Sequence, residues 1–116
     1  MVVDQPDRSG EDRIFAALSD ATRRDIVLRV LQHPESVSAL ASRYAMSFAA
    51  VQKHVAVLER AGLVTKVRRG REQLVSGRID TVRAVARSLH LYEEIWRGRI
   101  GRMEEILAEP PGEADR

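Results

Sequence analysis

The stretch SVSALASRYAMSFAAVQKHVAVLERAGLVTKVRRGR, residues 36–71, decides the fold of this chain. It holds a short helix pattern, a turn, a second and longer helix pattern, and then a small hairpin that ends in RRGR. Two short helices followed by a basic hairpin can present one helix to the DNA major groove and a loop to the groove beside it. The order of these patterns predicts a mainly α-helical winged helix-turn-helix with a small β-hairpin wing, and double-stranded DNA as its ligand.

Length and composition narrow the class of protein. The 116 residues suffice for one domain with a modest core and are too few for two. The absence of cysteine excludes disulfides, thiolate metal sites and a cysteine nucleophile. Residues 1–12 lack the apolar core of a signal peptide, and no apolar run is long enough to span a bilayer. We therefore expect a soluble, cytoplasmic protein that does not contact the membrane.

Charge is segregated along the chain, although the formal net charge is only +2. Residues 1–12 carry −3 and residues 109–116 carry −2, whereas seven basic residues and one acid give residues 43–71 a charge of +6. Such a basic middle indicates a nucleic-acid footprint, and the alternative is an ordinary solvated surface. The seven basic residues are Arg43, Lys53, Arg60, Lys66, Arg68, Arg69 and Arg71.

Apolar periodicity and capping residues predict five helices. They are expected over residues 12–18, over about 21–32, after the cap Ser36, between the cap Ser47 and the C′ residue Gly62, and over 79 to about 107. Asp20 caps the second helix and Pro34 ends it. As domain organisation we expect a flexible tail over residues 1–11, the winged domain with a C-terminal dimerisation helix over 12–108, and an acidic tail over 109–116.

The fourth predicted helix has an apolar and a polar side. At about 100° per residue, Val51, Val55 and Leu58 fall on one face and are expected in the core. The amide of Gln52, on the other side, can pair bidentately with adenine, and Lys53 can reach guanine or phosphate. Residues on this free face are Ala49, Gln52, Lys53, Ala56 and Arg60.

Three neighbouring residues have less certain roles. Ser47 at the helix start suits a phosphate, because its hydroxyl lies beside exposed N–H groups. Phe48 either contacts a thymine methyl or belongs to the core. His54 lies between the two faces, where it either hydrogen-bonds the backbone or a phosphate, or is purely structural.

Residues 63–69 and 72–78 alternate apolar and polar around Gly70, as a two-stranded hairpin would. Gly70 permits the positive φ of a tight turn. The guanidinium groups of Arg68, Arg69 and Arg71 then project toward phosphates or a narrow minor groove. Such a tip contributes affinity more than base choice, and the alternative is a hairpin kept soluble by its charge.

The last predicted helix carries an apolar stripe that one small domain cannot cover, which indicates a homodimer. Gly98 and Gly101 allow a bend or a close backbone approach, and Trp96 is either an interface anchor or a core residue. The stripe consists of Val82, Val85, Leu89, Tyr92, Trp96, Met103 and Leu107. Two-fold symmetry would place two reading helices about 34 Å apart and predicts a palindromic operator.

The stretches LSDATRRDIVLRVL, SVSALASRYAMSFAAVQKHVAVLERAGLV and RRGREQL resemble the ArsR/SmtB family of bacterial winged-helix repressors, over roughly residues 12–107. The resemblance implies that the second short helix enters the major groove, that the wing touches the backbone, and that the first and last helices form a dimer, with Phe15 in the interface. It also implies repression by occlusion of a promoter. The positions implied to bind DNA are Ser47, Ala49, Gln52, Lys53 and His54 on the helix and Arg68, Arg69 and Arg71 on the wing.

Many members of that family release DNA on binding metal, but this chain departs from both known kinds of site. Ser36, Val37 and Ser38 stand where the thiolate type has its Cys-x-Cys pair. His90 and Glu93 fit half of the type on the last helix, whose other half has only Asp80. We therefore expect no metal and no cofactor, and the inducer is unknown; a metal-responsive repressor using His90 and Glu93 is an alternative.

Two other classes of function predict different properties. A protein-interaction module would use the basic face for an acidic partner and would show no preference among DNA duplexes. An enzyme is not expected, because the chain has no plausible acid pair, no Ser-His-Asp spacing and no Gly-rich phosphate loop.

Overall fold

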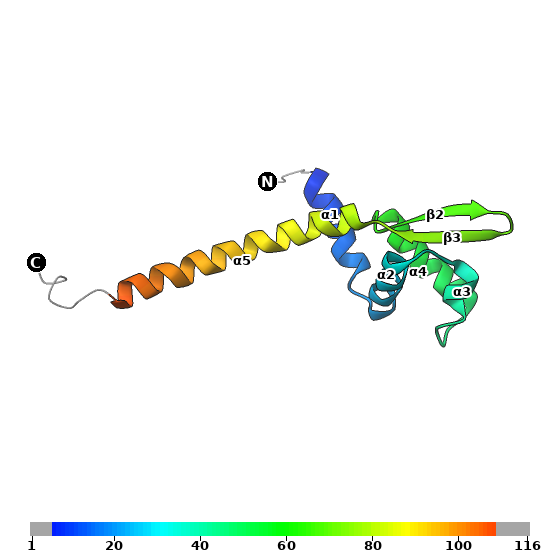
Figure 1. Ribbon diagram of the computed structural model, residues 1–116, viewed down its shortest axis with the longest axis horizontal. Coiled ribbons are helices and arrows are strands. Elements are labelled where there is room, and N and C mark those ends of the chain that lie inside the picture. The colour runs from blue at the N-terminus through cyan, green and yellow to red at the C-terminus, as the bar shows by residue number, and fades with distance from the viewer. Residues whose placement is uncertain (1–5, 109–116) are drawn as a thin grey trace, which may run out of the picture. The chain divides into compact units, whose positions relative to one another are not determined.

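A computed structural model describes residues 6–108, with side chains from residue 10 onward. The chain divides into two compact units between Arg83 and Ala84. The first unit contains four helices, a three-stranded sheet and the start of a fifth helix, and the second contains the rest of that helix (Figure 1). The expected tails over residues 1–5 and 109–116 lie outside the described residues.

The helix α1 spans Pro6–Ala17 and begins six residues before the expected Asp12. Residues 6–11, which the sequence placed in a tail, are therefore helical. Pro6 suits the first helical position, because its fixed φ is already helical and its missing N–H would have no partner there. Gly10 lies inside the helix and costs about 1 kcal/mol relative to alanine.

The helix α2 (Ala21–Gln32) has the predicted bounds. The Asp20 carboxylate accepts a hydrogen bond of 3.0 Å from the backbone N–H of Arg23, as expected of its cap. Ile26, Val27 and Val30 are buried on its inner side.

Three elements follow α2 along the chain. They are the short strand β1 (Glu35–Ser36), the short helix α3 (Val37–Ala41) and the longer helix α4 (Phe48–Arg60). Ser36 caps α3 by accepting from the N–H of Ala39 at 3.0 Å, and Ser47 caps α4 by accepting from the N–H of Ala50 at 3.1 Å. Both predicted caps are confirmed. They define the turn over residues 42–47 that joins the two helices.

The helix α4 ends in a Schellman motif. Gly62 has φ +79°, and the N–H groups of Gly62 and Leu63 donate 3.0 Å bonds to the carbonyls of Glu59 and Leu58. The side chains of Leu58 and Leu63 are both fully buried. This motif turns the chain directly from α4 into the sheet.

The sheet has three strands in the order β1-β3-β2, where the sequence predicted a two-stranded wing. The hairpin pairs β2 (Val64–Arg69) with β3 (Glu72–Gly77), from Val64 opposite Gly77 to Arg69 opposite Glu72. The third strand is β1, which pairs with the inner part of β3. Two residues are too few to show an alternating pattern, so β1 could not be read from the sequence.

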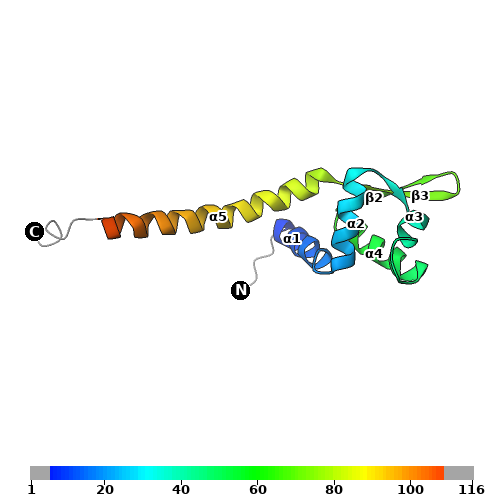
Figure 2. The same cartoon turned by 60° about the horizontal axis from the view of Figure 1, so that its bottom comes forward.

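Glycine at position 77 is required by packing against α2. A Cβ built there would lie 2.7 Å from Cδ2 of Leu31 and 3.0 Å from its Cα. A side chain there would displace the side chain of Leu31 and press against the backbone of α2. Figure 2 shows the hairpin extending from the base that α2, α3 and α4 form around it.

The last helix, α5, spans Ile79–Ala108, close to the prediction. At its start the Thr81 hydroxyl donates a 2.7 Å hydrogen bond to the Gly62 carbonyl, which anchors it to the end of α4. From Leu89 onward, every large apolar side chain of α5 is exposed.

Leu58→Ala should lower the free energy of unfolding by about 2–5 kcal/mol, because it removes a fully buried side chain beneath the reading helix and leaves a cavity. Chemical denaturation followed by circular dichroism would measure the loss. Leu28→Ala is the matched control, since Leu28 is 60% exposed, and its effect should be small. Equal losses in both variants would contradict the assignment of Leu58 to the core.

Candidate nucleic-acid interface

The two sides of α4 are separated as the sequence predicts. Val51, Val55 and Leu58 have no exposed surface, whereas Gln52 and Lys53 are exposed. The helix is thus held in the domain by one side and offers the amide and ammonium groups of the other to a ligand. This arrangement fits a helix that reads base edges.

The beginning of α4 is open to solvent. Phe48 is 47% exposed, so the predicted alternative in which it belongs to the core is wrong. Ser47 and Ala49 are exposed too, and the Ser47 hydroxyl oxygen is engaged in the cap. An exposed aromatic ring at the tip of an exposed polar helix is available for contact with a ligand.

His54 belongs to the structural support of α4. Its Nδ1 lies 3.3 Å from Nη1 of Arg23 and 3.9 Å from a carboxylate oxygen of Asp20, at the beginning of α2. The Arg23 guanidinium also donates to the carbonyl oxygens of Ala17 at 2.6 Å and Ala16 at 3.2 Å. Arg23 therefore joins the end of α1 to α4, a role that sequence patterns could not reveal because His54 lies 31 residues further along the chain.

The turn over residues 42–47 is tied to α2 through Tyr44. The Tyr44 hydroxyl donates a 2.6 Å hydrogen bond to Asp25, which also accepts from Arg29 at 2.9 Å. Burial, aided by the bond to Asp25, raises the pKa of Tyr44 to about 12, so the phenol stays a donor at neutral pH. The same hydrogen bond from Tyr44, followed by that from Arg29, holds the pKa of Asp25 below its usual range.

A second tie holds the turn to β1. Arg43 donates a 2.8 Å bond to Glu35, whose side chain is only 6% exposed. The sequence counted Arg43 in the basic surface, but its charge offsets a buried carboxylate. Lys66 lies 3.8 Å from Glu59, the one acid already counted in that range. The positive charge offered to a ligand is therefore smaller than +6 and is concentrated in the wing and on α4.

The wing tip is a two-residue loop formed by Gly70 and Arg71. Gly70 has φ +62°, as predicted, and the first loop position of a type II′ turn requires such a φ. Arg68, Arg69 and Arg71 are all exposed. Because neighbouring strand residues point to opposite faces, Arg68 and Arg69 face opposite sides of the hairpin.

A hollow lies between the wing and the starts of α3 and α4, and it brings several predicted site residues together. Phe48 and Gln52 line it from α4, and Arg68 and Arg71 line it from the wing. The other predicted residues, Ser47, Ala49, Lys53, His54 and Arg69, do not line it. Four further residues line the hollow, and the sequence analysis did not assign them to the DNA-binding site. The hairpin register was the only signal that could have pointed to two of them, Glu72 and Gln73. The four residues are Val37, Ser38, Glu72 and Gln73.

The half metal site on α5 consists of exposed side chains. Nδ1 of His90 lies 3.3 Å from Glu93 and Nε2 lies 3.7 Å from Glu94. Within the described residues, no group of three or more His, Asp or Glu side chains is arranged to hold a metal ion. Also within the part of the chain that the structure describes, no helix is long and apolar enough to cross a membrane.

An exposed polar helix face, a fixed turn before it and a basic hairpin beside it define a winged helix-turn-helix DNA-binding protein. The family described as bacterial regulatory protein, arsR family, matches residues 20–66. The chain is 38% identical over 72 residues to the uncharacterized HTH-type transcriptional regulator YuzN of Bacillus subtilis (strain 168). The aligned region covers 56% of this chain and 78% of that protein. The chain belongs to the ArsR family of transcriptional regulators.

Solved structures agree with this assignment. An ArsR-like transcriptional regulator from Rhodococcus sp. RHA1 has a TM-score of 0.76 and 32% identity, over 90% of this chain and 98% of that one. A homodimeric winged helix-turn-helix DNA-binding domain from Mycobacterium bovis has a TM-score of 0.61 and 22% identity, over 81% of this chain and 92% of that one. At 22% identity, the comparison with the Mycobacterium bovis domain shows only that the two chains share a fold.

Asp25→Asn should make unfolding less sensitive to acid. Because the folded pKa of Asp25 lies below its ordinary value of 3.8, its carboxylate stabilises the fold above that pH, and this contribution is lost as the pH falls through the folded pKa. The measurement is the denaturation midpoint at about pH 7 and about pH 3. Between these two pH values the unaltered chain should lose more stability than Asp25→Asn. Glu104→Gln, an exposed position on α5, is the control and should behave like the unaltered chain. The same loss for the unaltered chain and Asp25→Asn would refute the tie.

Proposed function

We propose that this regulator is a cytoplasmic, homodimeric repressor that binds a palindromic promoter operator. The observation that carries the proposal is the hollow where Phe48 and Gln52 of α4 adjoin Arg68 and Arg71 of the wing. A duplex that lies against it would meet base-reading groups and phosphate-binding groups at once. Repression follows if the occupied operator overlaps the promoter.

The proposed DNA contact of each residue follows from the chemistry of its side chain. Gln52 pairs with adenine, Lys53 contacts guanine or phosphate, and Phe48 contacts a thymine methyl. Ala49 lets α4 approach the bases, and Ser47 lies next to a phosphate. The wing arginines Arg68, Arg69 and Arg71 contact the backbone or the minor groove. His54 acts indirectly, because its contact with Arg23 holds α4 in place.

The exposed side of α5 supports the homodimer. Val82 is half-buried and Val85 is buried, so the exposed part of the predicted stripe begins at Leu89. Trp96 is 56% exposed and is therefore no core residue of a single chain. The sequence analysis did not include three exposed isoleucines, Ile95, Ile100 and Ile106. At about 100° per residue they fall on the same side of α5. The exposed apolar side consists of Leu89, Tyr92, Ile95, Trp96, Ile100, Met103, Ile106 and Leu107.

A second copy of this chain is the partner that this side fits. Phe15 of α1 is 40% exposed and is proposed to join the interface. An amphipathic helix needs a partner for its apolar side, and burial against a symmetric copy would stabilise α5. The related Mycobacterium bovis domain is homodimeric, which also supports the proposal.

Gln52→Ala should reduce discrimination at particular base pairs of the operator by about 1–3 kcal/mol, because a bidentate contact is lost. Arg71→Ala should weaken binding to all duplexes alike and reduce the salt dependence, because a phosphate contact is lost. Fluorescence anisotropy with an operator selected from random duplexes, and with single-base variants of it, would measure both effects. Uniform weakening by both variants would overturn the assignment of Gln52, and no preference among duplexes would favour a protein-interaction module.

Leu89→Glu should shift the chain from dimer toward monomer, because the charge would lie inside the proposed interface. Leu91→Glu is the matched control: Leu91 is similarly exposed, at 57% against 51% for Leu89. It lies about 200° round the helix from Leu89 and off the apolar side. Sedimentation equilibrium would report both masses. Dimers of Leu89→Glu as stable as those of the unaltered chain would rule out this interface.

A further inference from the structure

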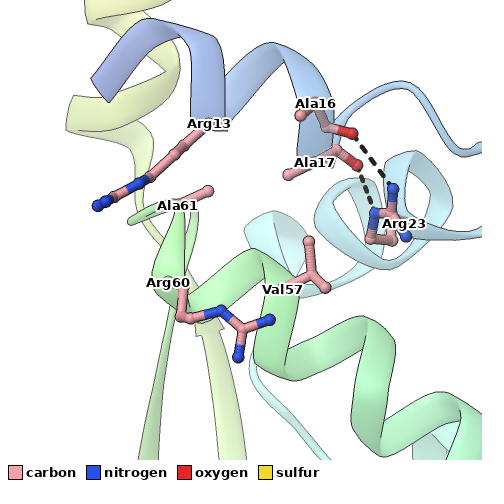
Figure 3. Close-up of a pocket in the computed structure, with 7 residues that line it drawn as sticks. All are labelled: Arg13, Ala16, Ala17, Arg23, Val57, Arg60 and Ala61. Atoms are coloured by element: carbon pink, nitrogen blue, oxygen red, sulfur yellow. Dashed lines mark hydrogen bonds between the residues drawn. The ribbon is translucent and has the colours of Figure 1, made fainter. Parts of the chain in front are cut away.

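A second hollow lies away from the wing, between α1, the beginning of α2 and the second half of α4 (Figure 3). It shares no lining residue with the hollow at the wing. Its volume of about 500 Å³ is within the usual range of small-molecule sites. Three arginines and four small apolar residues line it: Arg13, Arg23, Arg60, Ala16, Ala17, Val57 and Ala61.

The hollow exists because the facing residues of α1 and α4 are small. Ala16 and Ala17 end α1, and Val57 and Ala61 stand opposite them on α4 (Figure 3). Their methyl groups are too short to fill the space between the two helix backbones. They leave an apolar wall of limited size, against which a small hydrocarbon body can pack.

The charge of the hollow favours an anion. Three guanidinium groups supply about three positive charges, while the carboxyl ends of α1 and α4 together contribute about one negative charge. Asp20, which caps α2 next to Arg23, offsets one more. The lining itself contains no acidic residue. The amino end of α2 adds back about half a positive charge, so an excess of roughly one to two positive charges remains, which favours a small anion.

The three arginines differ in what they can still bind. Arg23 donates to the carbonyls of Ala16 and Ala17 and faces His54, so it is a fixed wall of the site. Arg13 and Arg60 make no hydrogen bond or ion pair with another described residue, and both are exposed. They extend from the two helices that border the opening (Figure 3). Either or both can swing toward a ligand without breaking an existing contact.

We propose that this hollow binds a small organic monocarboxylate. The carboxylate lies between Arg13 and Arg60, which favour such planar groups, and the apolar body lies against Ala16, Val57 and Ala61. A bound ligand bridges α1 and α4. On the function proposed above, α4 also carries Gln52 and Lys53, so occupancy changes affinity for the operator, and DNA changes affinity for the ligand by the same factor.

The binding test uses the full chain without DNA, so its outcome does not depend on the proposed function. Benzoate is the probe, and benzamide is the control with the same shape and no charge. Saturable shifts of the amide NMR signals of Ala17, Val57 and Ala61 by millimolar benzoate are expected, with binding of benzamide at least about tenfold weaker. No saturable shifts at these residues, or equal binding of the two compounds, would overturn the site.

Two variants test the arginines. Arg13→Gln and Arg60→Gln should each weaken benzoate binding about tenfold or more, because each removes a charged hydrogen-bond donor. Arg87→Gln, on the exposed second unit, should have no effect. An equal loss in all three variants would show that only net charge matters and would refute the site. Should a variant not fold, the comparison of benzoate with benzamide still decides the question.

The regulatory step has its own measurement. Operator affinity is determined by anisotropy with and without saturating benzoate, in the unaltered chain and in Arg13→Gln. A change in the first that is absent in the second is expected. An unchanged operator affinity with benzoate bound would refute the regulatory step alone, and failure to bind any duplex would refute the proposed function while leaving the carboxylate site intact.

Discussion

Burial of one side of α4 is the constraint on which the rest of the structure depends. Val51, Val55 and Leu58 have no exposed surface, and α1, α2, α3 and β2 all pack against this helix. Burying three such side chains contributes roughly 1.5–3 kcal/mol each, far more than any one surface ion pair. Because that side is committed to the core, the rotation of α4 about its axis is set, and with it the direction of Gln52 and Lys53.

Polar contacts refine this arrangement before the start of α4 and near its middle. Tyr44 and Arg43 hold the turn before α4, through Asp25 and Glu35, and Arg23 links the middle of α4 to the end of α1 through His54. Each contact joins segments that hydrophobic burial alone would leave free to slide. A reading helix needs such precision, since a hydrogen bond to a base edge tolerates displacements of only a few tenths of an ångström.

Sequence patterns predicted those features that depend on neighbours along the chain. The caps Asp20, Ser36 and Ser47 and the positive φ of Gly62 and Gly70 are all confirmed, because each is set by a few adjacent residues. The features that were missed depend on distant partners: β1 exists only because β3 pairs with it, and Arg43 is neutralised only because Glu35 folds back to it. The early start of α1 shows a local preference overridden, since Gly10 is helical despite its cost.

The close approach of Gly77 to Leu31 restricts how this hairpin can change its length. A shift of β3 by one residue would put Ser76, with its side chain, where only a hydrogen atom fits, and would also turn Val75 out of the core. Insertions are therefore tolerable only at the distal end, near Gly70, and in pairs that add one residue to each strand. The reach of the hairpin can then evolve in discrete steps while its base stays unchanged.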